Sequence, residues 1–376
     1  MKYISILFLL FSMFFHAQKM QVLDAETGKA ISGARIIVQN QILYTNDDGF
    51  APIDATEQSF EISAAGFKKI RLSNFRPVVK LNPRYKDIQE VKITKVNIKK
   101  IFEDVLKNYK KRYYSKPSLY DVTIKQKNFD NNQFHLMVIS EAKMWSKTNT
   151  YNVNLNDEVQ LQLNNVKYLN TNTSDNIFLA KTNDFTHQYT DDIFLDFELK
   201  RILKHLKNKK TKYSSNLSYE EDGEQIVDFK IKSNTGSVIE GNFRFNKTDK
   251  TVTYYQADYL MSNLPIQKKV SKEGKEFDYK YGNATITYDF YKKNNSYIPA
   301  LARFESDNYT MYYQSKAHVK KSVREIIFHT FSEADKNGLN PKVDFRKNIW
   351  ENIPVRDEKE MTVLLSAEEQ EFINKK

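Results

Sequence analysis

Neighbouring carboxylates are the residues of this sequence whose types and spacing could support chemistry. Asp47-Asp48 stands before Gly49, Asp191-Asp192 precedes an apolar periodic stretch, and Glu220-Glu221-Asp222 precedes an alternating one. Carboxylate oxygens bind Ca²⁺, and paired carboxylates can act as general acid and general base. The same residues also suit a hairpin turn, a helix N-terminus and a turn before a strand. We favour these structural roles and leave Ca²⁺ binding by Asp47 and Asp48 open.

Histidine does not add a metal or catalytic centre to these pairs. The six His residues include no pair with the four-residue spacing of a helical zinc site; they are His16, His135, His187, His205, His318 and His329. The sequence also contains no Gly-x-Ser-x-Gly turn, phosphate-binding loop or dinucleotide-binding glycine pattern. Because the chain has no Cys, it has no thiolate nucleophile or thiolate metal ligand. We predict no catalytic, cofactor-binding or metal-binding residue, no cofactor and no enzymatic activity.

Tyrosine is abundant, and several tyrosines could stack on a sugar or an apolar ligand. They are Tyr254, Tyr255, Tyr288, Tyr291, Tyr309, Tyr312 and Tyr313. In a chain rich in strands, however, aromatic side chains pack mostly against neighbouring strands. We therefore expect these tyrosines to pack across strands rather than to form a ligand platform.

The first residues have the layout of a secretory signal peptide. Lys2 precedes an apolar run from Ile4 to Phe15, and a small residue, Ala17, stands before a polar stretch. This order of basic start, short apolar core and small residue is typical of exported chains. The run is shorter than the about 20 apolar residues of a transmembrane helix. We predict that residues 1–17 are a signal peptide cleaved after Ala17; a buried N-terminal helix is the alternative.

The chain is basic, with a formal net charge of +11. Such a balance favours nucleic acid or an anionic membrane surface as a partner, and export makes nucleic acid the weaker of the two. Lys and Arg gather only in residues 107–112 and 204–210, each at the end of a helical pattern. Positive charge is favourable at a helix C-terminus, so we assign both clusters a structural role. An anionic membrane surface or an acidic partner is the alternative.

Residues 18–82 form a series of short alternating segments separated by polar turns. Phe60, Ile62 and Ala64 alternate with polar residues, which is the period of half-buried strands. Gly49 ends the turn that follows Tyr44, and Gly can supply the positive φ that such turns need. The segment predicts a small β module that is followed by a polar linker with Pro83.

The order of motifs in this module resembles that of the carboxypeptidase regulatory-like domain. The matching parts are Asp24 to Gly28, Gly33 to Val38, Thr45 to Gly49 and Ser63 to Phe67. Asn46 stands where the family more often has Asp, and Ala51 where it usually has an aromatic residue. The resemblance implies a transthyretin-like β-sandwich of the kind that heads cell-envelope proteins of Bacteroidota-type bacteria. It implies no peptidase, because the module itself is non-catalytic.

Residues 83–376 combine two helical patterns with many alternating segments. Apolar residues recur with helical spacing near 98–110 and 193–207, and Asn97 is a suitable N-cap for the first helix. Ser366 and Glu369 have the spacing of a capping box. Most of the remainder alternates between apolar and polar residues, except the polar stretch from Asn164 to Thr190. The whole chain is therefore predicted to be mainly β (α+β), a β-sandwich followed by a large antiparallel, curved β-sheet domain with a few packed helices.

These features favour a non-enzymatic binding or scaffold protein of the cell envelope. We expect an exported chain in the periplasm or on the periplasmic face of the outer membrane, where it serves as an accessory subunit of an outer-membrane complex. Its expected partners are outer-membrane or other envelope proteins, with an anionic membrane surface as a further possibility and no nucleic acid. The alternative is a periplasmic carrier that holds a lipid or another apolar ligand in the curved sheet. A hydrolase that uses paired carboxylates is the least supported alternative.

Overall fold

The computed structural model describes residues 18–39, 41–54, 57–84, 94–152, 158–170, 193–221, 223–234, 236–271, 274–344 and 364–374. The chain divides into two compact units, one formed by Met1–Tyr85 with Met361–Lys376 and the other by Lys86–Glu360. Each unit has its own hydrophobic core. The predicted signal peptide, residues 1–17, lies outside the described residues. None of the described helices is long and apolar enough to cross a membrane.

The first unit contains two small sheets around one core. Their strands are β1 (Gln18–Asp24), β2 (Arg35–Val38), β3 (Gln41–Tyr44), β4 (Phe50–Ile53), β5 (Gln58–Ser63), β6 (Ile70–Asn74) and β7 (Val78–Leu81). One sheet has the order β4-β1-β7 and the other β3-β2-β5-β6. Alternate residues such as Met20 and Val22 of β1 and Phe60 and Ile62 of β5 are fully or almost fully buried in the shared core. This arrangement confirms the predicted β-sandwich.

The turn between β3 and β4 holds the C-terminal helix of the chain, α6 (Ala367–Asn374). The Asp48 carboxylate accepts a hydrogen bond from the Ala367 N–H at 2.7 Å, and Asn46 Nδ2 donates to the Leu365 carbonyl at 3.2 Å. Ser366 and Glu369 form the predicted capping box, each backbone N–H donating to the other's side chain. These bonds explain why residues 361–376 group with the first unit, whereas the sequence assigned 83–376 to one domain.

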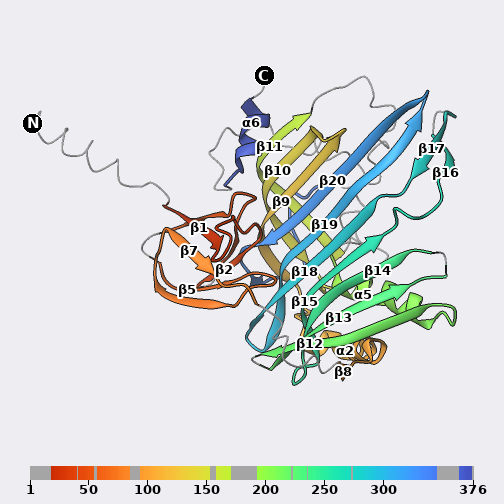
Figure 1. Ribbon diagram of the computed structural model, residues 1–376. Helices are drawn as coiled ribbons and strands as arrows, with labels where there is room; N and C mark the ends of the chain where they lie inside the picture. Colours follow the sequence, from red (N-terminus) through yellow and green to blue (C-terminus); the bar gives the residue numbers. More distant parts are fainter. Residues whose placement is uncertain are drawn as a thin grey trace, which may run out of the picture. The chain divides into compact units, whose positions relative to one another are not determined.

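The second unit is built on one large sheet (Figure 1). Along its main path the strand order is β11-β10-β9-β20-β19-β18-β15-β14-β13-β12-β8, and the pairs on this path are antiparallel. The strands are β8 (Thr94–Lys95), β9 (Ser118–Asp130), β10 (Gln133–Ser146), β11 (Val159–Asn170), β12 (Lys212–Glu221), β13 (Glu224–Lys232), β14 (Val238–Asn246), β15 (Thr251–Leu260), β16 (Gln267–Val270), β17 (Glu276–Lys280), β18 (Asn283–Lys293), β19 (Ser296–Tyr313), β20 (Lys316–Phe328) and β21 (Ser332–Glu333). The sheet is curved, so the predicted fold class is confirmed.

Two helices, α2 (Ile98–Arg112) and α5 (Leu195–Lys207), pack on the inner face of this sheet (Figure 1). Asn97 caps α2 as predicted, because its side chain accepts a hydrogen bond from the Lys100 N–H at 3.0 Å. Phe102 of α2 is fully buried and contacts the rings of Phe229, Phe243 and Tyr255 at centroid distances of 5.0–6.4 Å. The inner face of β13, β14 and β15 is therefore filled by helix side chains.

Strand β10 is buried on both of its faces. Leu136 and Val138 belong to the inner core, while Met137 and Ile139 on the opposite face are also at most 1% exposed. Trp145 shares that second face, and its Nε1–H donates to the Asp335 carbonyl at 2.8 Å. Apolar residues on both faces of a strand are typical of a strand that is covered on both sides.

Strand β11 is longer than the sequence indicates. The polar stretch was expected to begin at Asn164, but β11 continues to Asn170, which pairs with Leu136 of β10. An antiparallel ladder is held by backbone hydrogen bonds, so polar side chains do not end a strand that has a long neighbour. The expected surface segment can begin only after Asn170, and residues 171–192 lie outside the described residues.

Candidate functional site

The acidic pairs of the sequence have structural roles wherever the structure describes them. Asp47 Oδ1 accepts a hydrogen bond from Ser32 Oγ at 3.1 Å, and Asp48 binds the N-terminus of α6. Asp191-Asp192 and Asp222 lie outside the described residues, as do the side chains of Glu220 and Glu221 at the end of β12. Among the described residues no group of three or more His, Asp or Glu side chains is placed to hold a metal ion.

The histidines lie on separate elements of the second unit. His205 is on α5, where burial and the positive charge of Arg201 lower the pKa of its imidazole. His318 is buried on β20, and His329 Nε2 lies 2.8 Å from Thr123 Oγ1. His16, His187 and the side chain of His135 lie outside the described residues. The described histidines therefore occupy three different surroundings rather than one site.

Of the tyrosines considered as a platform, those in the sheet centre pack across strands. Tyr255 and Tyr288 are at most 1% exposed, and their rings are 6.2 Å apart in the core. Tyr254 points to the other face of β15, where its hydroxyl donates to Gln256 Oε1 at 2.8 Å. Tyr312 is 38% exposed at the far end of β19, and the side chain of Tyr309 lies outside the described residues. These positions do not make a single stacking surface.

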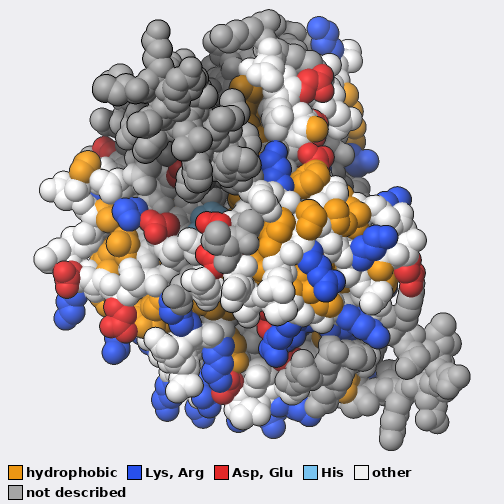
Figure 2. Space-filling view, turned by 90° about the vertical axis from the view of Figure 1, so that its left-hand side faces the viewer, with side chains coloured by type: hydrophobic (Ala, Val, Ile, Leu, Met, Phe, Trp, Pro, Cys, Tyr) orange, Lys and Arg blue, Asp and Glu red, His pale blue; other side chains and the backbone are white. Residues whose placement is uncertain are grey.

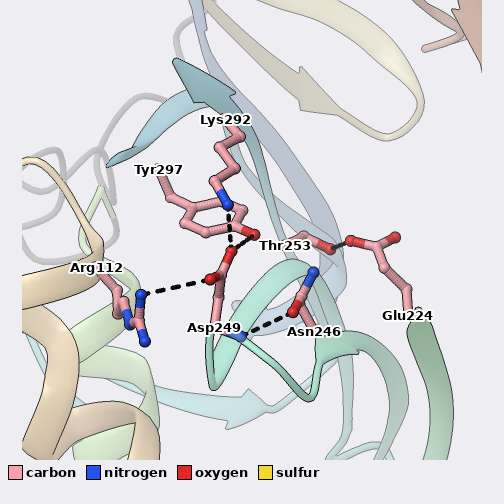
Figure 3. A network of polar contacts seen from close by, with 7 residues as sticks. All are labelled: Arg112, Glu224, Asn246, Asp249, Thr253, Lys292 and Tyr297. Atoms are coloured by element: carbon pink, nitrogen blue, oxygen red, sulfur yellow. Dashed lines mark hydrogen bonds and ion pairs between the residues drawn. The ribbon is translucent and has the colours of Figure 1, made fainter. Parts of the chain in front are cut away.

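Polar side chains from three parts of the second unit meet around Asp249 (Figure 3). Asp249 lies in the turn between β14 and β15, and its side chain is 12% exposed. Its Oδ2 accepts hydrogen bonds from Lys292 Nζ at 2.6 Å and Tyr297 OH at 2.8 Å, and Arg112 Nη1 lies 3.4 Å from Oδ1. The Asp249 N–H donates to Asn246 Oδ1 at 2.9 Å, which fixes the turn. The carboxylate thus gathers two cations and one phenol.

Regular structure positions each partner of Asp249. Arg112 is the last residue of α2, while Lys292 and Tyr297 flank the hairpin between β18 and β19. Next to Arg112, the Tyr113 hydroxyl accepts a hydrogen bond from the Val252 N–H at 2.9 Å and donates to the Val252 carbonyl at 2.7 Å. The network therefore ties the end of α2 to two hairpins at the same end of the sheet.

The electrostatics of the Asp249 network favour a structural role. The hydrogen bond from Lys292 is the main cause that lowers the pKa of Asp249, with further contributions from Tyr297 and Arg112. Burial, reinforced by Asp249, raises the pKa of Tyr297 to about 12. At neutral pH the carboxylate is therefore ionised and the phenol protonated. A general acid or base works best with a pKa near the working pH, and neither group meets that condition.

A second carboxylate, Glu198 of α5, is completely buried. Its Oε1 accepts hydrogen bonds from Tyr255 OH at 3.0 Å and Tyr259 OH at 2.5 Å. Its Oε2 accepts from Arg201 Nε at 2.8 Å and also from Arg201 Nη2. Burial is the main cause that raises the pKa of both tyrosines, and the Glu198 charge adds to it. Each Glu198 oxygen thus has two donors, as a buried charge requires.

Neither the Asp249 network nor the Glu198 network was predicted from the sequence. Glu198 carries a signal that could have been used, because it falls on the apolar side of α5 between Leu195 and Ile202. An acid on the buried face of an amphipathic helix indicates a partner in the core. Asp249 carries no such signal, since it stands in an ordinary polar turn and its cationic partner Arg112 is 137 residues away.

The predicted basic clusters lie at the ends of the two helices. The last turn of α2 contains Lys110, Lys111 and Arg112, and that of α5 contains Lys204, His205 and Lys207. Figure 2 shows Lys and Arg side chains scattered among hydrophobic and polar ones over one face rather than gathered in a single patch. Both clusters thus occupy the positions that favour positive charge along a helix.

Apolar side chains are most exposed where β16 borders the large sheet. Ile266, just before the short strand β16, is 55% exposed, and Val270 at the end of that strand is 64% exposed, with Lys268 between them. β16 pairs with β17, and β17 pairs with the end of β19 that carries Tyr312. We call Ile266, Val270 and Tyr312 the edge strip. Exposed apolar residues grouped in this way are typical of interaction surfaces.

Comparison with known proteins adds little to this geometry. No protein-family model and no curated protein matches the chain. A domain from Vibrio parahaemolyticus, provisionally described as an outer membrane lipoprotein-sorting protein, resembles it with 8% identity and a TM-score of 0.23 over 63% of this chain and 93% of that one. A protein from Bacteroides fragilis NCTC 9343, provisionally described as membrane-associated and of unknown function, has 9% identity and a TM-score of 0.14 over 84% and 97%. Likenesses of this size carry no argument about function.

Proposed function

We propose that this chain is a non-enzymatic cell-envelope protein that works by binding other proteins. In this proposal it is an accessory or scaffold subunit on the periplasmic side of an outer-membrane complex. The observation that carries the proposal is the edge strip, in which Ile266, Val270 and Tyr312 are 38–64% exposed at β16 and its neighbours, and β16 pairs with β17 alone among the described strands. Apolar side chains at an unpaired strand edge favour association with another chain.

The charged groups of the interior support a binding role over a catalytic one. The Asp249 and Glu198 carboxylates are each held by cations and phenols of the same chain. A catalytic carboxylate instead needs an approach for substrate and a proton to exchange. The carboxylate of Glu198 is completely buried, which leaves substrate no such approach.

The proposed location follows from the sequence. The layout of residues 1–17 is that of an export signal. The order of motifs in residues 18–82 resembles a module that heads envelope proteins, and the described first unit has the β-sandwich fold that this resemblance implies. Periplasm or the periplasmic face of the outer membrane is the compartment that agrees with both features.

The alternative of a carrier for an apolar ligand is less favoured. A carrier would hold its ligand against the concave face of the curved sheet. On β13, β14 and β15 that face is already in contact with α2, as the rings of Phe102, Phe229 and Phe243 demonstrate. A ligand at this place would have to displace fully buried core side chains, which would cost several kcal/mol.

Affinity purification of the tagged full chain from detergent-solubilised envelopes tests the proposal. We expect specific proteins to co-purify with the natural chain and to be lost with the double variant Ile266→Ser, Val270→Ser. Tyr213→Ser is the matched control, because Tyr213 is 42% exposed on β12, away from the edge strip. Recovery of the chain alone, or equal recovery of partners by both variants, would contradict the proposal.

A further inference from the structure

We propose that β16 accepts an extended segment of a partner protein as an additional antiparallel or parallel strand, and that apolar and acidic residues alternate along one face of this segment. The inference rests on the proposed binding function and specifies the partner's chemistry. Strand addition at a free sheet edge gains affinity from backbone hydrogen bonds, and side chains that face the neighbouring strand supply specificity. Three features of β16 support this mode of binding.

The first feature is the free backbone edge of β16. Within the described residues β16 pairs with β17 alone. The Ser271 N–H donates to the Lys275 carbonyl at 2.8 Å where this hairpin begins. The N–H group of Ser271 therefore points toward β17. The backbone groups of successive residues in an antiparallel pair point to opposite sides, so those of residues 269 and 267 also point toward β17. The N–H and C=O groups of Lys268 and Val270 are therefore directed to the outer edge, where a partner strand would meet them.

The second feature is the placement of the side chains along this edge. Side chains alternate between the faces of a strand, so Ile266, Lys268 and Val270 share one face. The register continues that face from Lys268 to Asp278 of β17 and on to Tyr312 of β19. On the opposite face the Lys269 ammonium lies 3.8 Å from the ring centroid of Tyr279, a cation–π contact. The edge strip is thus exposed on one face, while on the other face Lys269 is engaged by the Tyr279 ring.

The third feature is the charge of β16, which contains Lys268 and Lys269 and no acidic residue. Opposite charges across a strand pair are favourable, whereas like charges directly opposite each other are unfavourable. An acidic residue opposite Lys268 would form a charge pair with it, and apolar residues opposite Ile266 and Val270 would cover these exposed side chains. The exposed apolar positions and the cation between them therefore define a partner segment with an apolar, an acidic and an apolar residue at every second position, all on one face.

The same charges weigh against two other occupants of the edge. A second copy of this chain that paired Ile266 with Val270 across a two-fold axis would set Lys268 directly opposite Lys268. An anionic lipid surface would meet the whole exposed face, which also carries Glu276 opposite Val270 and Asp278 opposite Lys268. A partner strand would lie beside β16, at least one strand spacing of about 4.8 Å farther from these carboxylates. A protein segment of opposite charge is the occupant that these observations favour.

Two labelled synthetic peptides of equal length test the inference by fluorescence anisotropy with the full chain. The first repeats Val-Thr-Glu-Thr and the second repeats Val-Thr-Lys-Thr, so that Val and the charged residue alternate along one face of the strand. We expect the Glu peptide to bind about tenfold more tightly, because the charge directly opposite Lys268 changes sign between the peptides. The double variant Lys268→Glu, Lys269→Glu should reverse this preference, and this outcome does not depend on any loss of folding.

A proline variant tests the backbone part of the inference. Val270→Pro removes the N–H group that faces the outer edge and spares the ladder with β17, because Pro is tolerated on edge strands in this orientation. We expect it to lower the affinity for the Glu peptide at least about tenfold, through a lost hydrogen bond and altered strand geometry. Val270→Thr, which keeps this N–H, is the matched control and should retain most of the affinity.

Several outcomes would overturn the inference. Equal binding of both peptides would do so, as would binding of phosphatidylglycerol vesicles by a chain that binds neither peptide. A dimer in sedimentation velocity that Val270→Pro abolishes would assign the edge to a second copy of the chain. If partners still co-purify through Ile266 and Val270 while neither peptide binds, strand addition is wrong and the proposed binding function stands. If partners are not recovered at all, the proposed function itself fails.

Discussion

The two ends of strand β15 differ in their surroundings: charged groups are buried and paired at one end, and apolar side chains are exposed near the other. At the end where β15 begins, Asp249 lies with two cations and a phenol inside the chain, and its side chain is 12% exposed. Beyond the other end, at Leu260, the chain continues to Ile266 and Val270, which are more than half exposed at β16, a strand that pairs with β17 alone in the part of the chain that the structure describes. At the first end the polar groups are paired within the chain, whereas near the second end apolar side chains and backbone groups of β16 are accessible to a partner.

This difference separates polar groups that hold the fold from groups that are suited to binding. Buried charges persist in proteins when other groups of the same chain satisfy them, and their removal is felt as instability. Exposed apolar side chains contribute little to stability, since folding does not take them fully out of water. Substitutions in the buried networks should therefore change the free energy of unfolding, and substitutions at the edge strip should change binding.

The largest effect is expected at Glu198, the most deeply buried carboxylate of the described chain. Glu198→Ala leaves the Arg201 cation and the hydroxyls of Tyr255 and Tyr259 without their shared acceptor. Loss of one partner of a buried ion pair destabilises proteins by about 3–5 kcal/mol. Urea unfolding followed by circular dichroism should report a decrease of this size in the free energy of unfolding.

An exposed glutamate on the other helix provides the control for this substitution. Glu103 lies on the exposed side of α2. Glu103→Ala should change the free energy of unfolding by no more than about 0.5 kcal/mol, as is usual at surface positions. If the two variants unfolded at the same urea concentration, the Glu198 network would not contribute to stability.

A smaller effect is expected at Asp249. Asp249→Asn weakens the attraction to Arg112 and Lys292, whose side chains are 41% and 47% exposed, so solvent screens much of it. The hydrogen bond from Tyr297 is less exposed and carries more of the effect. We expect a loss of about 1–2 kcal/mol in urea unfolding. Asp278→Asn, at the opposite end of the sheet, is the control and should change stability by no more than about 0.5 kcal/mol.

The contribution of Asp249 should also depend on pH in a defined direction. The pKa of its carboxyl is lowered in the folded chain, chiefly by the hydrogen bond from Lys292. A carboxyl with a lowered folded pKa stabilises the protein above its unfolded pKa of about 3.9, and this stability is lost as the pH falls through the folded pKa. The difference in stability between the natural chain and Asp249→Asn should be full at pH 6 and smaller below about pH 4. A difference that grew on acidification would contradict the assignment.

The sequence predicted the elements of the fold because their causes are local. Alternation in segments such as Phe60 to Ala64 predicts strands, helical spacing near 98–110 predicts α2, and Asn97 and Ser366 are recognisable caps. It did not predict that β11 would reach Asn170, because the cause is the long neighbouring strand β10. Nor did it predict that residues 361–376 would join the first unit, since this depends on bonds between positions 319 residues apart.

The edge strip and the Asp249 network could not be predicted from the sequence, because both depend on contacts and exposure that only the folded chain establishes. Val270 has no unusual neighbours in the sequence, and its importance arises from exposure at the edge of a strand. Arg112 appeared as one of several cations at a helix end, and only the fold brings it to Asp249. The tyrosines were correctly expected to pack across strands at Tyr255 and Tyr288, but the hydrogen bond from Tyr255 to the buried Glu198 was not foreseen.

The smallest effect on stability is expected at the edge strip, where the effect on binding should be largest. Ile266→Ser with Val270→Ser replaces side chains that are already 55% and 64% exposed, so the free energy of unfolding should change by no more than about 0.5 kcal/mol. Urea unfolding of the purified variant measures this directly. A loss of more than about 2 kcal/mol would mean that these side chains belong to the packing of the hairpin rather than to a surface for a partner. Unchanged stability together with lost partners would leave binding as the reason for their exposure, because exposed apolar side chains offer the free chain no gain in folding free energy.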